Sequence, residues 1–171
     1  MLAWYVACVK TNLDFFAAAN LRDQGFEVFL PAYREVKEKN GKRSMVVCPL
    51  YAGYIFVRFD VELHKWRSVN GTRGVVGLLA SGPESPSRLP LGFIEELMKT
   101  VDNDGYFAVE KEKEVVKKFA VGDHVVVNTN AFNGLEGRVE KVTHNRVVVL
   151  LALLSQEIRA IIAPTHLERF S

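Results

Sequence analysis

Apolar and polar residues follow two different periods along the first hundred residues, which predicts a mixture of strands and helices. AWYVACV (3–9) is apolar and rich in strand formers, as a buried strand is. After Asn12, a suitable helix N-cap, apolar residues fall near helical spacing until Gly25. Asn40-Gly41 lies between two extended arms and predicts a hairpin. Further strands are predicted at 26–31, 53–59 and 75–80, and further helices at 62–69 and 91–101. This order of elements predicts an α+β sandwich, with helices packed on a sheet.

The aromatic stretch PLYAGYIFVRF (49–59) divides between two faces of its strand. Alternation places three side chains on the face toward the helical core: Ile55, Val57 and Phe59. The opposite face carries Tyr54, Phe56 and Arg58. We therefore expect Tyr54 and Phe56 to be exposed or covered by something other than the helical core. The simpler alternative is burial inside their own domain.

The last fifty or so residues have a different pattern. β-branched runs are interrupted by Gly122, Gly134 and Gly137, and short strands at this spacing predict a small all-β barrel. A domain of about 55 residues is near the lower limit for an independent core. Between the two parts, residues 102–118 alternate in charge and are poor in core residues, which favours a flexible linker over a solvated helix. The predicted organisation is a first domain at 1–101, the linker at 102–118 and a second domain at 119–171.

Composition narrows the function classes. The chain has 171 residues, 49% of them hydrophobic, and a formal charge of +2, so it is globular and too close to neutral to coat nucleic acid by charge alone. No apolar run is long enough to span a membrane, and the start lacks the features of a signal peptide. The distant Cys8 and Cys48 argue against a zinc site and for a reduced, cytoplasmic setting. Asp102 and Asp104 have no partner in a metal-site spacing, and no catalytic motif is present. We therefore expect no enzymatic activity, no metal, no cofactor and a monomer.

Any small barrel needs glycine at its sharp turns, so the glycines alone do not identify a family. The order of the motifs in the second part is not explained by turns alone. V-G-D-x-V-x-V, F-x-G-x-x-G-x-V and R-V-x-V-x-L follow one another from Val121 to Leu151. This order resembles the KOW motif, which occurs in ribosomal proteins and in the NusG family of transcription elongation factors. The tripeptide WYV (4–6), the stretch 49–59 and Arg73-Gly74-Val75 recur in this order in the NusG amino-terminal (NGN) domain. The resemblance thus covers nearly the whole chain.

Within that family, NGKR in the hairpin and Arg73 are more similar to the specialised RfaH-like paralogues than to general NusG, which usually carries proline in place of Arg73. The resemblance implies an NGN α/β sandwich followed by an SH3-like β-barrel KOW domain. It implies an operon-specific transcription elongation and antitermination factor that binds the clamp helices of the largest RNA polymerase subunit and raises processivity. The alternatives are a general NusG and a ribosome- or RNA-binding KOW protein.

The resemblance also implies three sets of binding residues. Those for RNA polymerase are Leu30, Tyr51, Tyr54 and Phe56. Those that match a DNA-reading face for the non-template strand are Lys10, Gln24, Thr72 and Arg73, and further cations able to contact phosphates are Arg22, Lys65 and Arg67. That face departs from the family pattern at Thr11, Phe16, Asn20 and Asp23. The predicted contacts of the KOW domain with a small-subunit ribosomal protein or with the termination factor Rho are Phe132 and Ile158.

The second domain of RfaH can also be stored as a helical hairpin. The ion pair that stabilises this state would need an acid at position 48, where this chain has Cys48, although Arg138 is retained. The run RVVVLL (146–151) is heavily β-branched, which disfavours a helix. We therefore predict a barrel as the ground state.

Overall fold

The computed structural model describes residues 1–80, 85–107, 119–128, 134–143, 146–153, 156–162 and 164–170. The elements of the first part are β1 (Leu2–Val9), α1 (Asp14–Asp23), β2 (Glu27–Phe29), β3 (Ala32–Lys39), β4 (Lys42–Pro49), β5 (Tyr54–Asp60), the 3₁₀ helix η1 (Trp66–Gly71), β6 (Val75–Leu78) and α2 (Phe93–Met98). Those of the second part are β7 (His124–Val127), β8 (Leu135–Thr143), β9 (Arg146–Leu153), β10 (Gln156–Ile162), the 3₁₀ helix η3 (Pro164–His166) and β11 (Leu167–Arg169).

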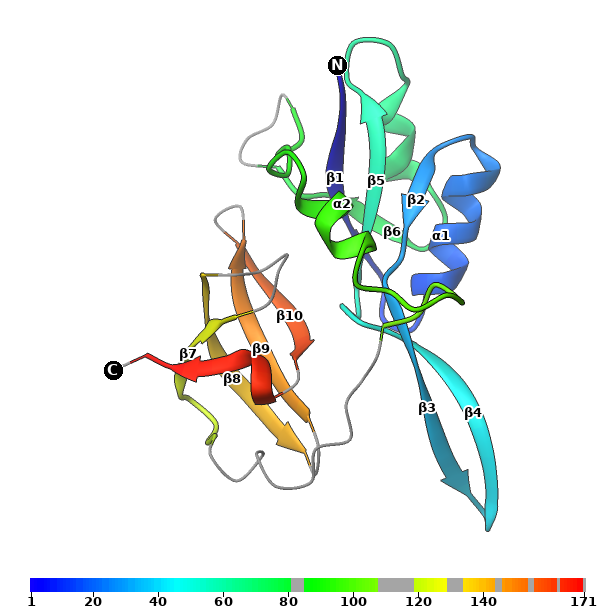
Figure 1. Ribbon diagram of the computed structural model, residues 1–171. Coiled ribbons are helices and arrows are strands. Elements are labelled where there is room, and N and C mark those ends of the chain that lie inside the picture. The colour runs from blue at the N-terminus through cyan, green and yellow to red at the C-terminus, as the bar shows by residue number, and fades with distance from the viewer. Residues whose placement is uncertain are drawn as a thin grey trace.

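The first part is built on a four-stranded sheet with the order β2-β5-β1-β6 (Figure 1). β1 runs antiparallel to β5 and β6, and β2 runs antiparallel to β5. The core on one face joins α1 to Ile55, Val57 and Phe59, as strand alternation predicted. The core on the other face contains Ile94 and Leu97 of α2. A helix therefore covers each face, and the predicted α+β sandwich is confirmed.

The ends of α1 follow the sequence signals only in part. Gly25 has a φ of +87° and its N–H donates to the Arg22 carbonyl at 2.8 Å, so glycine ends the helix as predicted. Asn12 is not the N-cap, which is a correction: it adopts a φ of +61°, and the helix begins at Asp14 after Leu13. The Asp14 carboxylate instead accepts a hydrogen bond from the Gly53 N–H at 2.6 Å, which fixes the start of α1 to the loop before β5.

β3 and β4 form a separate two-stranded ribbon that extends away from both sheets (Figure 1). Asn40 and Gly41 both have positive φ at its tip, which confirms the predicted hairpin turn. Val36 and Met45 are directly opposite each other on the ribbon and are 52% and 62% exposed.

The turn at residues 102–107 corrects the prediction of a flexible linker over this stretch. The Arg34 guanidinium pairs with Asp102 at 2.9 Å and with Asp104 at 3.0 Å, and lies 4.6 Å from the centre of the Tyr106 ring. The Phe107 N–H donates to the Ala32 carbonyl at 2.9 Å. The turn is thus attached to the base of the ribbon, while residues 108–118 of the predicted linker lie outside the described residues. The domain limits stay a prediction.

The second part is a five-stranded antiparallel sheet with the order β10-β9-β8-β7-β11, which confirms its all-β class. β-branched residues supply most of its buried side chains, which include Val125, Val127, Val139, Val147, Val149, Leu151, Ile158, Ala160, Ile162 and Leu167. Gly137 allows β8 and β9 to approach closely, because a Cβ there would lie 2.6 Å from Val149 Cγ1. The β-branched stretch that disfavoured a helix forms β9.

Within the described residues, no helix combines the length and the apolar character that a membrane crossing requires.

Candidate functional site

Phe56 of β5 lies at the centre of an aromatic cluster on the sheet face opposite α1. Its ring centre is 6.0 Å from that of Tyr51, 6.2 Å from that of Phe29 and 6.5 Å from that of Phe93. Phe56 is 2% exposed and Tyr51 is 3% exposed. Phe56 therefore points away from α1 as predicted, but the chain's own α2 and β2 cover it.

β2 contributes a different residue to this face from the one predicted. Phe29 is in register with Phe56 on the neighbouring strand, whereas Leu30 packs with the core on the α1 side. Successive side chains of a strand point to opposite faces, so only one of the two can join the cluster. We define the aromatic face as Phe29, Tyr51, Tyr54 and Phe56; Leu30 is not part of it.

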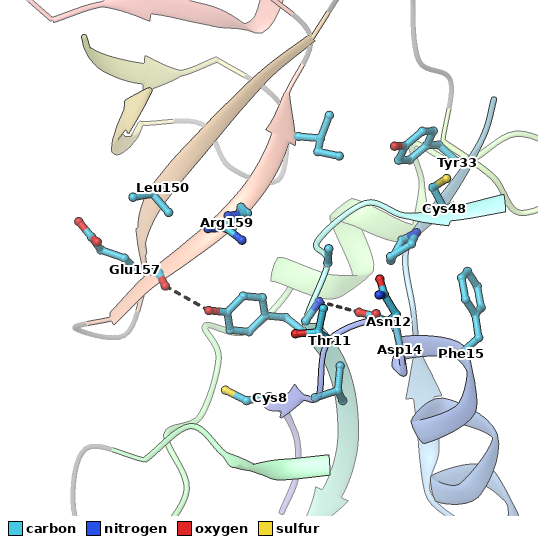
Figure 2. A pocket seen from close by; sticks show the side chains of 16 residues that line it. Cys8, Thr11, Asn12, Asp14, Phe15, Tyr33, Cys48, Leu150, Glu157 and Arg159 are labelled. Carbon is cyan, nitrogen blue, oxygen red and sulfur yellow. Dashed lines mark hydrogen bonds between the residues drawn. The ribbon is translucent and has the colours of Figure 1, made fainter. Parts of the chain in front are cut away.

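Tyr54 is half-buried, unlike Tyr51 and Phe56, and it contacts the second domain. Its hydroxyl donates a hydrogen bond to the Glu157 carbonyl of β10 at 3.3 Å (Figure 2). The Ile161 N–H, also on β10, donates to the Leu50 carbonyl at 3.4 Å. Burial raises the pKa of the Tyr54 hydroxyl, which keeps it protonated as a donor. β10 thus lies against the edge of the aromatic face.

A crevice of about 610 Å³ lies between the two domains beside Tyr54 (Figure 2). Its walls include Cys8, Cys48 and Arg159. Burial raises the pKa of both thiols, so neither is an activated thiolate nucleophile. The crevice therefore has the character of a domain boundary, not of a thiol-based catalytic site.

A second surface forms where α1 meets the segment before β6. Two residues of α1 and Gln24, which follows its last residue, are spaced by four and contact three consecutive residues of that segment, so the contacts form a ladder. Gln24 Nε2 donates to Thr72 Oγ1 at 2.8 Å, and Asn20 Nδ2 donates to the Arg73 carbonyl at 3.0 Å. One turn earlier, Phe16 packs on Gly74, where a Cβ would lie 3.3 Å from Phe16 Cδ1. We call this arrangement the α1 ladder.

Most of the predicted nucleic-acid residues lie at the surface. The exposed ones are Lys10, Arg22, Gln24, Lys65, Arg67 and Arg73. Lys10 joins the α1 ladder, since its N–H donates to the Gly74 carbonyl at 2.8 Å. Arg67 lies over the Trp66 ring at 4.5 Å, and Arg22 donates to the Val28 carbonyl at 3.2 Å. Trp66 itself is partly buried and stacks near Phe59, as expected of a core residue.

Thr72 differs from the others because it is 5% exposed. Its hydroxyl donates to the Ser68 carbonyl at 3.0 Å and accepts from Gln24. It thus positions the segment and does not present a donor at the surface.

Phe16 and Asn20 were noted in the sequence only as departures from a basic pattern. Their spacing of four residues, continued to Gln24, was the signal that one helix stripe carries all three.

The two predicted contacts of the second domain have different outcomes. Ile158 is 5% exposed because alternation along β10 directs it into the sheet's own core, which corrects its prediction as a surface contact. Phe132 lies outside the described residues. Arg138 lies 4.0 Å from Glu157 within its own sheet, and Cys48 Sγ donates to Glu35 at 3.2 Å, so these two residues do not pair with each other.

Comparison with known proteins agrees with this architecture. The family model described as "Transcription termination factor nusG" matches residues 2–98, more than half of the chain. The chain is 28% identical over 135 residues to the transcription termination/antitermination protein NusG of Halalkalibacterium halodurans, covering 78% of this chain and 74% of that protein. It is 27% identical over 152 residues to the protein of the same name from Staphylococcus aureus, covering 87% of this chain and 81% of that protein.

A solved structure on domain interaction in Thermotoga maritima NusG covers 100% of this chain and 98% of its own, with a TM-score of 0.54 and 18% identity. That likeness concerns the fold, an α+β first domain followed by an all-β second domain.

Proposed function

Since this chain belongs to the NusG family of transcription termination and antitermination factors, a non-enzymatic family, we propose that it binds RNA polymerase and increases its processivity. The clamp helices of the largest polymerase subunit would dock on the aromatic face beside Tyr54. The observation that carries this proposal is the position of Tyr54, a half-buried aromatic at the edge of a preformed aromatic cluster. Aromatic residues dominate binding hot spots because they bury a large area at a small entropic cost.

Phe56 and Tyr51 would act from beneath the contact, whereas Phe29 is half-buried like Tyr54. Since Phe56 and Tyr51 are almost completely buried, they support the shape of the face and leave Tyr54 to make the direct contact. Leu30, on the other side of the sheet, has no part in this proposal.

Docking at Tyr54 requires the second domain to move, because β10 occupies the edge of the aromatic face. The two hydrogen bonds that join the domains here, at 3.3 and 3.4 Å, are long, and long hydrogen bonds are weak. A polymerase that buries Tyr54 would have to replace these two hydrogen bonds and the apolar packing between the domains beside them.

Tyr54→Phe should shift the domains toward separation by about 1 kcal/mol or less, because it removes one hydroxyl donor and keeps the ring. The measurement is the amide chemical shifts of β10 in the full-length protein, compared with those of Tyr106→Phe, whose ring contacts Arg34 instead. If β10 signals change equally in both variants, Tyr54 does not join the domains.

The test of the proposed function is a paused-transcription assay with the full-length protein. Tyr54→Ala should abolish most of the pause suppression, since it removes the aromatic side chain from the docking surface. Leu63→Ala is the matched control, because Leu63 is an 81% exposed apolar residue beyond the opposite end of β5. Equal pause suppression by wild type and Tyr54→Ala would remove the aromatic face from the mechanism.

The finer proposal is an operon-specific factor of the RfaH kind that contacts the non-template DNA strand. It is supported by the exposure of Arg73 and Lys10 on the α1 ladder. The KOW domain would recruit a small-subunit ribosomal protein or Rho, with Phe132 as the predicted contact. A genome with no other NusG-like gene would favour a general NusG instead.

The rival from another class is a ribosome- or RNA-binding KOW protein. A pull-down with purified polymerase core separates the two proposals: RNA binding without polymerase binding would favour the rival.

A further inference from the structure

The tip of the β3–β4 ribbon carries the dipeptide Asn40-Gly41, and few contacts hold this part of the chain. Both residues are exposed and have positive φ, +53° and +72°. The ribbon projects from both sheets (Figure 1), and a two-stranded hairpin is only marginally stable on its own. Within the described residues, no hydrogen bond restrains the Asn40 side chain. The tip can therefore open locally while the rest of the domain stays folded.

The strand residues next to the tip contribute little to keeping it closed. Lys39 and Lys42 are exposed and directly opposite each other, and like charges in register destabilise a strand pair. The next pair, Glu38 and Arg43, forms an ion pair at 3.2 Å, but its side chains are 57% and 78% exposed. Ion pairs this exposed stabilise a structure only weakly. Opening at the tip is therefore easier than opening of the sheet below it.

We propose that Asn40 is a site of spontaneous deamidation, with water as the co-reactant. When the tip opens, the Gly41 backbone nitrogen can bond to Cγ of Asn40. The nitrogen gives up its proton, the side-chain Cγ–N bond breaks, and ammonia leaves. Water then opens the resulting five-membered succinimide at either carbonyl, which gives aspartate or isoaspartate without oxidation or reduction. Glycine favours the attack, because it has no side chain to hinder its nitrogen.

Asn70-Gly71 is the same dipeptide in a restrained setting. Asn70 is also exposed, so access to water does not distinguish the two sites. The Leu78 N–H donates to Asn70 Oδ1 at 2.9 Å, and this oxygen would lie 3.7 Å from a Cβ built at Gly77. Both residues of the dipeptide belong to η1, whose Val69 is completely buried. Attack on Asn70 Cγ therefore requires this hydrogen bond to break and η1 to unfold.

Deamidation changes both the charge and the backbone of the tip. A carboxylate at position 40 lies between two lysines and makes the tip less positive. Isoaspartate also adds a methylene to the backbone, which does not fit the two-residue turn that brings Lys39 opposite Lys42. The amide signals of residues 36–45 should therefore change as the protein ages. Those of β1, β5 and β6 should persist, because the ribbon is a separate sheet.

The experiment incubates the full-length protein near neutral pH, in its native state and in guanidinium chloride, and measures deamidation by peptide mass spectrometry. A glutamate-specific protease places the two sites in separate peptides, 39–62 and 63–84. In the native protein, Asn40 should deamidate about tenfold or more faster than Asn70, because the tip opens without unfolding of the domain. In guanidinium chloride the two rates should be nearly equal, since neither side chain is then restrained. The third Asn-Gly of the chain, 133–134, begins outside the described residues and falls in another peptide.

Equal rates at the two sites in the native protein, a native rate ratio that persists in guanidinium chloride, or an Asn40 that stays intact would each overturn the inference. Asn40→Gln is the control for the spectral change, because it keeps the side-chain amide but lengthens the ring that must close. Its tip signals should persist on incubation while those of wild type are lost. These outcomes do not depend on polymerase binding, so they are independent of the paused-transcription assay with Tyr54→Ala.

Discussion

Replacing Phe56 by alanine should destabilise the first domain by about 3–5 kcal/mol, since large-to-small changes of buried phenylalanine lose both transfer free energy and packing. Phe56 is 2% exposed and contacts the rings of Tyr51, Phe29 and Phe93. Its removal leaves a cavity between β5 and α2. Urea denaturation of the full-length protein, followed by a probe in the first domain, measures the change in the free energy of unfolding.

The control for this experiment is Phe15→Ala, which removes the same ring from a site that is 46% exposed and should cost much less. A loss of less than 1 kcal/mol in Phe56→Ala would contradict the burial of Phe56 in the aromatic cluster. The expected instability also affects how transcription assays are interpreted. An inactive Phe56→Ala protein does not identify a polymerase contact, whereas a folded but inactive Tyr54→Ala protein does.

Gly137→Ala should unfold or severely weaken the second domain while the first domain stays folded. The added Cβ would lie 2.6 Å from Val149 Cγ1 and 2.7 Å from the Leu150 carbonyl oxygen, so β8 and β9 would have to separate. Overpacking of this kind costs about 1–3 kcal/mol or more, and a domain of this size has only a few kcal/mol of stability. In an amide correlation spectrum, the signals of β7 to β11 should collapse toward unfolded values while those of β1, β5 and β6 persist.

Gly71→Ala is the matched control for that substitution. Apart from the backbone next to it in the chain, no heavy atom of the described residues lies within 4 Å of a Cβ built at Gly71, and its φ is not in the left-handed region. This variant should retain both sets of signals. A dispersed second-domain spectrum in Gly137→Ala would show that β8 and β9 can separate without loss of the sheet.

Local sequence patterns predicted an element well where one preference decided it, such as strand alternation or the turn preference of Asn-Gly. Alternation along β5 assigned Ile55, Val57 and Phe59 to the α1 core correctly, and Asn40-Gly41 located the hairpin turn. The pattern could not show that α2 would pack over Phe56, because that contact depends on the path of the chain between β6 and α2. Helix 91–101 was predicted, but the α-helix is shorter, from Phe93 to Met98.

At the candidate site, a prediction that was wrong by one residue assigned a side chain to the wrong face of the sheet. Assigning Leu30 in place of Phe29 to the aromatic face is a shift of one residue, and in a strand such a shift exchanges the two faces. The surface cations could be selected from the sequence because lysine and arginine are mostly exposed. The burial of Thr72 could not, because it depends on a hydrogen bond from Gln24, which is 48 residues away in the chain.

The β3–β4 ribbon also bears on the solubility of the protein. A ribbon that projects from a domain offers its backbone N–H and C=O groups to other chains, and exposed Val36 and Met45 would favour such self-association. Lys39 and Lys42 are directly opposite each other next to the tip. Like charges in register destabilise the ribbon slightly, but they also repel a second copy that approaches in the same orientation. The tip of the ribbon therefore trades some local stability for protection against edge-to-edge aggregation.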